Sequence, residues 1–308
     1  STSEAGGTAI FGVKLMSPPS DNVTISVSSS NTSEGMVNSD HLSFTSENWN
    51  ADQTVTLTGV DDNVSDANQA YWVLLGADNI TSDLTYRSLN PPDVMVTNLD
   101  DETAGFLVST VSSNLLEPSS TSTFIVKMLS QPTDQVTIPL SVSDIGEALV
   151  SPTSLVFTTV NWNADHEVKL TAVDDNLSDG TQAFFVRLGA DNSTSDTSGY
   201  RGLDPQDVPG ATEDDESAGF TMTINSYTSE SGAISTIKIK LDSQPNDNVT
   251  LGVLSSDTTE GKITGISSGG TDNISFTTSD WNTYKSIVIT GQDDNLSDGN
   301  QSYKIELS

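Results

Sequence analysis

The chain has 308 residues, with no cysteine, 11 lysine and arginine residues and 43 aspartate and glutamate residues, so its formal net charge is −32 and its sequence pI is about 4.1. This surplus of acid argues against binding to nucleic-acid phosphates or to an anionic membrane. The absence of cysteine excludes disulfides, thiol nucleophiles and cysteine-ligated metals. No apolar run approaches the roughly 20 residues of a membrane helix. The first residues lack the basic and apolar regions of a signal peptide, so we expect a mature chain or an excised fragment.

The sequence repeats itself. The segment FTSENWNADQTVTLTGVDDNVSD at 44–66 returns in similar form at 157–179 and 276–298. A hydrophobic content of 34% is also compatible with disorder, but a disordered chain has little need to keep its hydrophobic pattern in phase over such distances, so we predict three folded units. The third copy holds six extra residues, which we place in the Gly/Ser-rich segment 265–270. The markers of the repeat are Trp49, Trp162 and Trp281, spaced 113 and 119, and the opening acids Glu4, Glu117 and Glu230, spaced 113 and 113.

Apolar residues alternate with polar ones in each repeat, which is the period of a β-strand with one buried face. Tyr71, Val73 and Leu75 are apolar in all three repeats, whereas the positions between them carry a charge in at least one repeat. We find no helical spacing. About seven short strands per repeat, separated by turn clusters, predict an all-β fold of tandem antiparallel Ig-like β-sandwiches. Further strands are expected at 23–27, 42–44 and 55–57.

Acidic residues occupy corresponding turns of each repeat. The four places are the opening acid, an Asp-rich loop after a strand, the loop after the second strand, and a closing Asp-Asp-Glu. Loops of a sandwich gather at its two poles, so we expect these acids to share one small volume if all four places meet at one pole. The candidate metal ligands are Glu4, Asp61, Asp62, Asp66, Asp100, Asp101, Glu102, Glu117, Asp144, Asp174, Asp175, Asp179, Asp214, Asp215, Glu216, Glu230, Asp257, Asp293, Asp294 and Asp298.

Carboxylates crowded in this way must protonate, move their loops apart or bind a hard cation. Two unit charges 4 Å apart repel by about 4 kcal/mol at an effective dielectric constant of about 20, and several such pairs exceed the roughly 5–15 kcal/mol that stabilises a domain. Calcium accepts roughly six to eight oxygen ligands in flexible geometry, whereas magnesium prefers to keep its waters and zinc prefers His or Cys. The competing interpretation is a set of ordinary solvated Asx-turns. An EF-hand is not expected, because Asp179 occupies the position that needs glycine.

The motifs resemble those of the Calx-beta family, the calcium-binding sandwich module of sodium–calcium exchangers and large bacterial surface proteins. The resemblance is carried by Ser-Glu-x-Gly-Gly-Thr-Ala-x-Phe-x-Val at 3–13, by a strand that ends in Asp-Asp, and by the closing Asp-Asp-Glu-x-Ala-Gly-Phe. It implies a sandwich of about seven strands with calcium at the end that meets the next module. Asn31 replaces the loop acid in the first repeat, which weakens one calcium position there. In the second repeat the implied ligands are Glu117, Asp144, Asp174, Asp175, Asp179, Asp214 and Asp215.

The repeats are cut out of phase at both ends of the sequence. We expect β-sandwich repeats at 1–102, which lacks its first strand, at 103–216, which is complete, and at 217–308, which lacks its last strand and the closing acids. The simplest interpretation is a segment of a longer array. The alternative, in which neighbouring molecules supply the two strands, is less favoured because the chain shows no spare strand to donate.

Other motifs carry less weight. The pattern G-x-S-x-G at 265–269 matches a nucleophile elbow, but it lies in an insertion of an all-β repeat without a His partner, so we do not expect an enzyme. Sequons such as those at Asn22 and Asn79 permit glycosylation in a host that glycosylates, but Asn in a turn before a strand is the favoured explanation. Trp72 and Phe185 fall on the solvent face, where they either mark a contact between subunits or cover loops.

We therefore predict a calcium-rigidified structural or adhesive segment of a secreted or cell-surface repeat protein. Ca²⁺ is the expected cofactor, and the expected partners are neighbouring repeats of the same or adjacent chains, with a surface glycan or protein as a further partner, but no nucleic acid and no membrane span. Two alternatives stay open: a subunit of a self-assembling extracellular fibre or sheath, and a module that binds glycan or protein.

Overall fold

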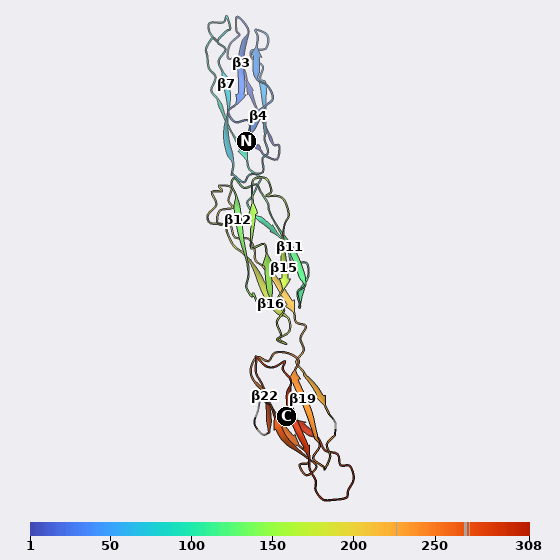
Figure 1. The fold of residues 1–308 in the computed structure, drawn as a ribbon. Coiled ribbons are helices and arrows are strands. Elements are labelled where there is room, and N and C mark those ends of the chain that lie inside the picture. Colours follow the sequence, from blue (N-terminus) through green and yellow to red (C-terminus); the bar gives the residue numbers. More distant parts are fainter. Residues whose placement is uncertain (226, 268–269, 271) are drawn as a thin grey trace.

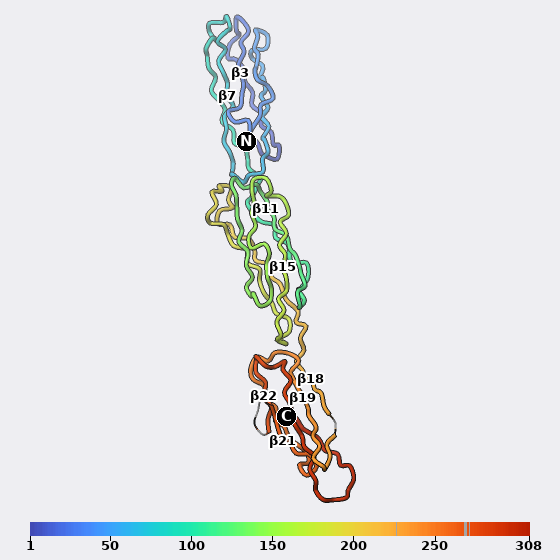
Figure 2. The backbone as a smooth tube through the Cα atoms, viewed as in Figure 1, coloured from blue at the N-terminus to red at the C-terminus, as the bar shows by residue number. Residues whose placement is uncertain are grey.

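The computed structural model describes residues 1–225, 227–267, 270 and 272–308. Three β-sandwich units follow one another along the chain and lie end to end (Figure 1). A single stretch of backbone leads from each unit to the next (Figure 2). None of the described residues is helical, so the predicted all-β fold is confirmed. Within the same residue ranges, no helix has the length and apolar character needed to cross a membrane.

Each unit is built from short strands in two sheets. The first unit contains β1 (Thr2–Ser3), β2 (Thr8–Val13), β3 (Val23–Ser29), β4 (Gly35–Val37), β5 (His41–Phe44), β6 (Gln53–Gly59), β7 (Gln69–Gly76) and β8 (Val94–Leu99). The second unit contains β9 (Phe106–Val108), β10 (Leu115–Leu116), β11 (Thr121–Met128), β12 (Val136–Val142), β13 (Ala148–Ser151), β14 (Ser154–Phe157), β15 (His166–Ala172), β16 (Gln182–Leu188) and β17 (Val208–Glu213). The third unit contains β18 (Phe220–Ile224), β19 (Ile234–Leu241), β20 (Val249–Ser255), β21 (Gly261–Ile266), β22 (Asn273–Phe276), β23 (Lys285–Gly291) and β24 (Ile305–Leu307).

The second unit shows the sheet topology most fully. One sheet has the order β10-β17-β16-β12-β14 and the other has the order β13-β15-β11-β9. The stretch 106–116 supplies β9 to one sheet and β10 to the other, and 148–157 supplies β13 and β14 in the same way, so nine segments stand where the sequence predicts about seven strands. The first unit has sheets β1-β8-β7-β3-β5 and β2-β6-β4, and the third has β18-β19-β23-β21 and β22-β20-β24.

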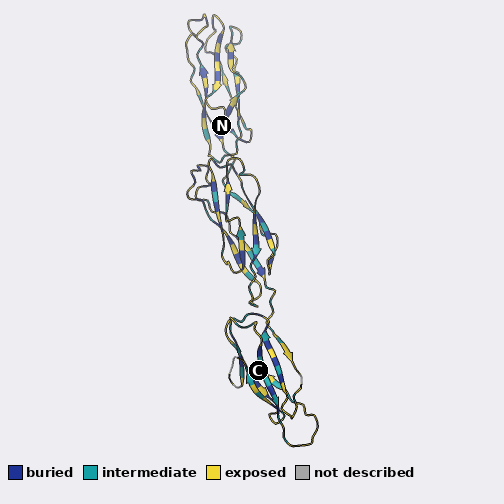
Figure 3. Ribbon diagram, viewed as in Figure 1, coloured by how far each residue is buried: buried dark blue, intermediate teal, exposed yellow. Residues whose placement is uncertain are grey.

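The predicted alternation of side chains is confirmed in β7. Tyr71, Val73 and Leu75 are buried, whereas Trp72 and Leu74 are exposed. The strands show this alternation as successive dark blue and yellow bands (Figure 3). Each unit encloses its own hydrophobic core between its two sheets. The units are therefore packed independently and meet at their ends.

Paired substitutions keep one core position filled in every unit. Where a tyrosine occupies this position, its hydroxyl end approaches the backbone so closely that a Cβ on the facing glycine would lie 2.2 Å from the tyrosine side chain. The facing pairs are Gly35 with Tyr71 and Gly261 with Tyr303. At the corresponding positions of the second unit the sequence has Ala148 and Phe184, which lie in the same hydrophobic core.

A buried carboxylate joins two loops of the first unit. Asp83 accepts hydrogen bonds from the Ser20 amide at 2.6 Å and from the Ser20 hydroxyl at 3.0 Å. It also accepts bonds from the amides of Thr85 at 2.7 Å and Tyr86 at 3.2 Å. These donors, with the Ser20 amide first, hold the pKa of Asp83 at about 2. Because every partner favours the charged form, this carboxylate is satisfied without a cation.

We predict that Asp83→Ala lowers the melting temperature of the first unit by several degrees, because it leaves buried donors unpaired. Folding lowers the pKa of Asp83 from 3.8 to about 2, so its stabilisation is present above the higher value and is lost as the pH falls through the lower one. Calorimetry between pH 7 and pH 2 therefore shows the two melting temperatures converging in acid. Asp52→Ala, at an exposed site, is the control and melts like the wild type. An Asp83→Ala variant that melts like the wild type at pH 7 contradicts the prediction.

Candidate metal centre

Parallel strand pairing brings the opening and closing acids of a unit together. In the first unit β1 pairs in parallel with β8, and the Glu4 amide donates to the Leu99 carbonyl at 3.0 Å. In the second unit β10 pairs in parallel with β17, and the Glu117 amide donates to the Glu213 carbonyl at 3.1 Å. In each pair, the residue that follows either strand is an acid. The pairing therefore places Glu4 beside Asp100 and Glu117 beside Asp214.

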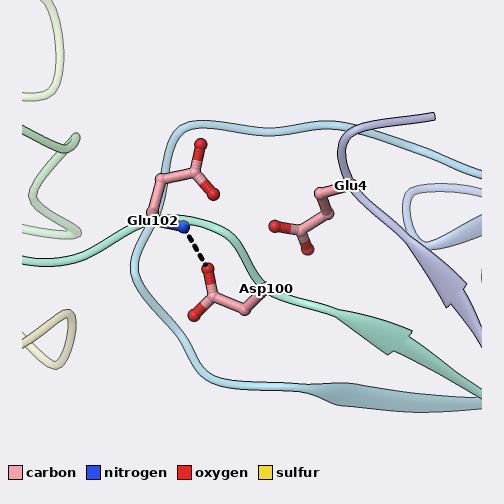
Figure 4. Close-up of side chains that lie close together, drawn as sticks. All are labelled: Glu4, Asp100 and Glu102. Atoms are coloured by element: carbon pink, nitrogen blue, oxygen red, sulfur yellow. Dashed lines mark hydrogen bonds between the residues drawn. The ribbon is translucent and has the colours of Figure 1, made fainter. Parts of the chain in front are cut away.

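Three groups of acids lie in the first unit, two of which share Glu102, and within each group one carboxylate oxygen of every member lies within 4.8 Å of the others. Figure 4 shows the carboxylate of Glu4 directed toward the closing segment that carries Asp100 and Glu102. The amide of Glu102 donates to Asp100 Oδ1 at 2.9 Å, and the amide of Ala67 donates to the other oxygen at 2.7 Å, so Asp100 joins the Asp-rich loop to the closing segment. The three groups are Glu4, Asp100 and Glu102; Glu34, Asp62 and Asp66; and Asp61, Asp101 and Glu102.

The burial of these acids is not matched by hydrogen bonds. Glu4 is only 2% exposed, and its Oε2 atom has no hydrogen-bond partner among the described residues. Within the same part of the chain, Oε2 of Glu102 is also buried without a partner. Burial first, and then the neighbouring carboxylates, raise the pKa of Glu4 to about 8 and also raise the pKa of Glu102. An unpaired buried carboxylate is costly, so this pocket has the chemistry of a cation site.

The second unit repeats the arrangement. Glu117 groups with Asp174 and Asp215 on one side and with Asp214 and Glu216 on the other, again within 4.8 Å. Burial, and then the charge of Asp175, raise the pKa of Glu117 to about 7. Burial, and then the charge of Asp215, raise the pKa of Glu216 to about 7, and its Oε2 has no hydrogen-bond partner in the described part of the chain.

The third unit holds its acids more openly. Burial raises the pKa of Glu260, followed by the charges of Asp298, Asp294, Asp257 and Glu230. Glu230 is exposed, unlike its buried counterpart Glu4. The carboxylate of Asp293 accepts the Asn295 amide at 3.0 Å. The predicted residues of this unit therefore surround Glu260 without closing over it.

Sequence reasoning missed one acid in each unit. Glu34 and Glu147 are 6% and 8% exposed and face the Asp-rich loop, and burial followed by nearby Asp charges raises the pKa of both. For Glu147 these charges are Asp179, Asp144 and Asp175. The available signal was periodicity, since Glu34, Glu147 and Glu260 are spaced 113 and 113.

The turn residues three positions before these glutamates, Asn31, Asp144 and Asp257, have a different local role. Asn31 Oδ1 accepts the Ser33 amide at 3.1 Å, Asp144 Oδ1 accepts the Gly146 amide at 2.9 Å, and Asp257 Oδ1 accepts the Thr259 amide at 2.9 Å. Each side chain closes the turn that presents the buried glutamate three residues later. The first unit has Asn31 where the other two units have an aspartate. The asparagine keeps the turn and leaves Glu34 in the cluster.

A second residue was missed in the first unit. Asn98 is fully buried, and its amide group donates to Glu4 Oε1 and to Glu34 Oε2, each at 3.4 Å, and to the Val60 carbonyl at 3.1 Å. Its Oδ1 accepts the Thr2 hydroxyl at 2.9 Å. Asn98 therefore lies between two buried acids and orients both, a role that an uncharged residue in a strand does not reveal by sequence.

The donor set of the clusters consists of oxygen atoms. The chain has no cysteine, and both histidines are engaged elsewhere: His41 contacts Asp40 at 2.6 Å, and His166 packs against Phe157 with ring centroids 4.3 Å apart. A hard cation with several carboxylate ligands, and calcium above all, fits these residues better than zinc. For the discounted nucleophile elbow, Gly265 and Ile266 lie in β21, while positions 268 and 269 lie outside the described residues.

Comparison with known proteins identifies the family. The Calx-beta domain model matches residues 1–102 and 120–217. Because this match covers more than half of the chain, the chain belongs to the Calx-beta family. The third unit lies mainly outside the match and is related to the other two by its repeated sequence. No curated protein sequence matches the chain.

Several solved structures are distantly similar. The calcium binding domain CBD12 of CALX1.1 is 17% identical with a TM-score of 0.28, over 61% of this chain and 76% of that one. FdeC, an Escherichia coli adhesin, is 11% identical with a TM-score of 0.27, over 93% of this chain and 88% of that one. Domains 4–9 of the surface layer protein SbsC are 10% identical with a TM-score of 0.27, over 92% of this chain and 36% of that one.

We predict that Glu117→Gln stabilises the metal-free second unit at pH 8 by a few degrees of melting temperature. Folding raises the pKa of Glu117 from 4.5 to about 7, so the wild type loses stability as the pH rises through this window, and the variant loses less. Thermal unfolding in excess chelator between pH 5 and pH 8 measures both slopes. Glu167→Gln, at an exposed position of β15, is the control. A lower melting temperature of Glu117→Gln in chelator at pH 8 contradicts the prediction.

Proposed function

We propose that this member of the Calx-beta family binds calcium at the acidic end of each unit and that the bound ion stiffens the junction with the next unit. The protein then acts as a structural or adhesive segment of a secreted or cell-surface repeat protein. Calx-beta is a calcium-binding family, and the clusters described above supply the ligands on this chain.

The observation that carries the proposal is the state of Glu4. A carboxylate that is 2% exposed, with one oxygen unpaired and other carboxylates within 4.8 Å, is held in place at a free-energy cost. An ordinary solvated turn has no such residue, and Asp83 shows what this chain does when a buried acid is satisfied by its own amides. The contrast between the two acids favours a cation at the first and none at the second.

Each part of the chain has a distinct task at the site. Glu4 supplies a buried carboxylate and Glu117 a half-buried one, and the Asp-rich loop and the closing acids supply the neighbouring oxygens. Glu34 and Glu147 approach from the loop after the second long strand. Asn98 holds two of these acids in the first unit. The ion supplies the positive charge that allows all of these carboxylates to remain ionised together.

The same loop that carries the ligands contacts the following unit. The carbonyl of Asn63 accepts the amide of Gln131 at 2.6 Å, and the carbonyl of Asn176 accepts the amide of Gln244 at 2.7 Å. In each loop the preceding Asp is folded back onto the chain, since Asp62 Oδ1 accepts the Val64 amide and Asp175 Oδ1 accepts the Leu177 amide. The geometry of these loops therefore sets the position of a contact with the neighbouring unit.

The closing acids provide a second link at each junction. Asp100 and Asp214 are directly followed by the segments that become β9 and β18 of the next unit. An ion that fixes both the Asp-rich loop and the closing acids restrains two separate connections between the same two units. This arrangement supports a stiffening role. An extracellular setting is part of the same proposal, and we expect the affinity for calcium to lie in the range of extracellular modules, about 10⁻⁴–10⁻³ M.

We predict that calcium raises the melting temperature of the chain relative to chelator. At a calcium concentration of one hundred times Kd, each occupied site adds about 2.7 kcal/mol to the free energy of unfolding. The double variant Asp174→Asn with Asp175→Asn loses the calcium-dependent rise of the second unit. Glu117→Gln, which is stabilising in chelator, becomes destabilising in saturating calcium, whereas Glu167→Gln changes neither. Calorimetry with calcium, with magnesium and with chelator measures these effects, and identical melting temperatures with and without calcium remove the proposal.

We also predict that calcium narrows the distribution of distances between the first two units. The chain has no native cysteine, so spin labels attached to Ser46→Cys and Thr159→Cys report on this junction alone. Pulsed electron paramagnetic resonance in chelator gives a broad distribution that sharpens in calcium. A calcium-independent distribution, together with a calcium-dependent melting temperature, retains the binding and refutes the stiffening.

A further inference from the structure

One sheet of the third unit carries lysines without acids. The sheet has the order β18-β19-β23-β21, and these four strands contain no aspartate or glutamate, in a chain that has 43 of them. One of their lysines, Lys285, faces the core, is 4% exposed and pairs with Asp280 at 2.7 Å. The other three lie on the outer face of the sheet: Lys238 and Lys240 in β19, and Lys262 in β21.

The register of the sheet gathers hydroxyl groups around two of these lysines. Ile237 and Ile239 of β19 belong to the hydrophobic core, so Lys238 and Lys240 leave the strand on the opposite side, about 7 Å apart. Their neighbours on the adjacent strands are Thr221 beside Lys240, and Thr223 and Ser286 beside Lys238. This part of the sheet is therefore polar and positively charged.

Lys240 lacks the acidic partner that its counterparts have. In the first two units the corresponding lysine forms an ion pair with an aspartate across the sheet. These pairs are Lys14 with Asp52 at 4.0 Å and Lys127 with Asp165 at 3.9 Å. The third unit has Tyr284 in place of the aspartate, and Nζ of Lys240 lies 5.9 Å from the centroid of its ring. The lysine keeps a neighbour but remains free to meet an anion.

Three further positions also make this face more positive than that of the second unit. Lys238 and Lys262 are basic where the second unit is apolar, and Ser286 is neutral where the second unit is acidic. The corresponding residues are Ile125, Leu149 and Glu167. The second unit has Lys169 where the third has Val288, so its two lysines, Lys127 and Lys169, share the face with Asp165 and Glu167. In the third unit both acids are replaced.

The face is accessible. Among the described residues, none of its three lysines forms an ion pair with a carboxylate, and the ring of Tyr284 is 45% exposed. Asp242 borders the face, and its carboxylate accepts the Thr221 hydroxyl. The corresponding sheet of the second unit has the same number of strands, and Leu149 on its outer face is 54% exposed. Stacking of the units end to end therefore does not cover this surface.

The charges of this face favour an anionic partner. The net charge of the chain is −32, but at physiological ionic strength the influence of exposed charges falls off over about 8 Å, so an anion on the sheet meets the lysines first. The lysines are spread over two strands and do not converge on one point. This spread fits an extended polymer with repeated anionic groups better than a single small anion.

The groups beside the lysines favour a polysaccharide over an acidic polypeptide. The hydroxyls of Thr223 and Ser286 both donate and accept hydrogen bonds, as sugar hydroxyls do, and the Tyr284 ring offers an apolar surface to the C–H groups of a sugar ring. An extended polypeptide typically adds to the edge of a sheet through main-chain hydrogen bonds. Lys238 and Lys240 instead stand on an interior strand of this sheet.

We propose that the outer face of the sheet β18-β19-β23-β21 binds an anionic polysaccharide. Lys238 and Lys240 contact successive charged groups of the polymer, Tyr284 and the neighbouring hydroxyls contact its sugar rings, and Lys262 contacts the polymer further along the face. The proposal does not depend on calcium, because none of these residues belongs to the acidic clusters.

The test measures fluorescence anisotropy of a labelled sulfated dextran oligosaccharide with the full chain, in excess chelator and at about 0.15 M salt. We expect saturable binding that weakens as salt is added, and no binding of unsulfated dextran of the same length. The double variant Lys238→Gln with Lys240→Gln binds at least tenfold more weakly. The matched control, Lys127→Gln with Lys169→Gln, makes the same change of net charge on the corresponding sheet of the second unit and keeps the wild-type affinity.

A second variant guards against a loss that is due to unfolding. Ser286→Glu restores the acid that the second unit has at this position, and we expect it to weaken binding of the sulfated probe while the melting temperature stays at the wild-type value. Absence of binding, or an equal loss in the control pair, overturns the proposal. Equally tight binding of poly-glutamate of the same charge also overturns it, because the face would then select an acidic polypeptide. Sedimentation as a dimer that the Lys238→Gln and Lys240→Gln changes dissociate would overturn it in favour of a second copy of the chain.

Discussion

The mutual repulsion of carboxylates that the backbone forces together is the constraint on which the architecture of each junction depends. Parallel pairing of β1 with β8, and of β10 with β17, fixes Glu4 and Glu117 beside the closing acids. The sheets cannot release this contact without losing ladder hydrogen bonds, so the repulsion has to be relieved by protons or by a cation. The raised pKa values of Glu4 and Glu117 show that protonation relieves the repulsion when no ion is bound. A bound cation would instead allow the carboxylates to remain ionised.

The location of the cluster gives this local electrostatic problem a long-range consequence. Its ligands come from the end of one unit, and the two segments that carry most of them are also the segments that contact or continue into the next unit. A change in charge at the cluster therefore acts on the junction and leaves the separate hydrophobic cores intact. On the proposed function, the units keep their fold while a bound ion changes the freedom of the angle between them.

The sequence was sufficient for the fold and for most of the cluster, because both depend on periodicity. Alternation predicted the buried face of β7, and the repeat aligned the Asp-rich loops. The loop acids Glu34 and Glu147 share that periodicity, but they stand three residues after Asn31 and Asp144, the positions that the sequence analysis selected. The role of Asn98 could not be predicted from the sequence, because it depends on the parallel register of β1 and β8, which no local pattern encodes.

The closing segment and the acidic cluster together define a direction for the repeat. Each unit donates its closing segment forward, where Gly105-Phe106 and Gly219-Phe220 complete the sheets of the following units. The acids that immediately precede this segment belong to the donating unit, so one short stretch both holds the cluster and closes the neighbour. A repeat built in this way is joined by strand addition and by charge at the same place. If the cluster holds an ion as proposed, the two interactions reinforce each other, since ordering the closing acids also orders the strand that follows them.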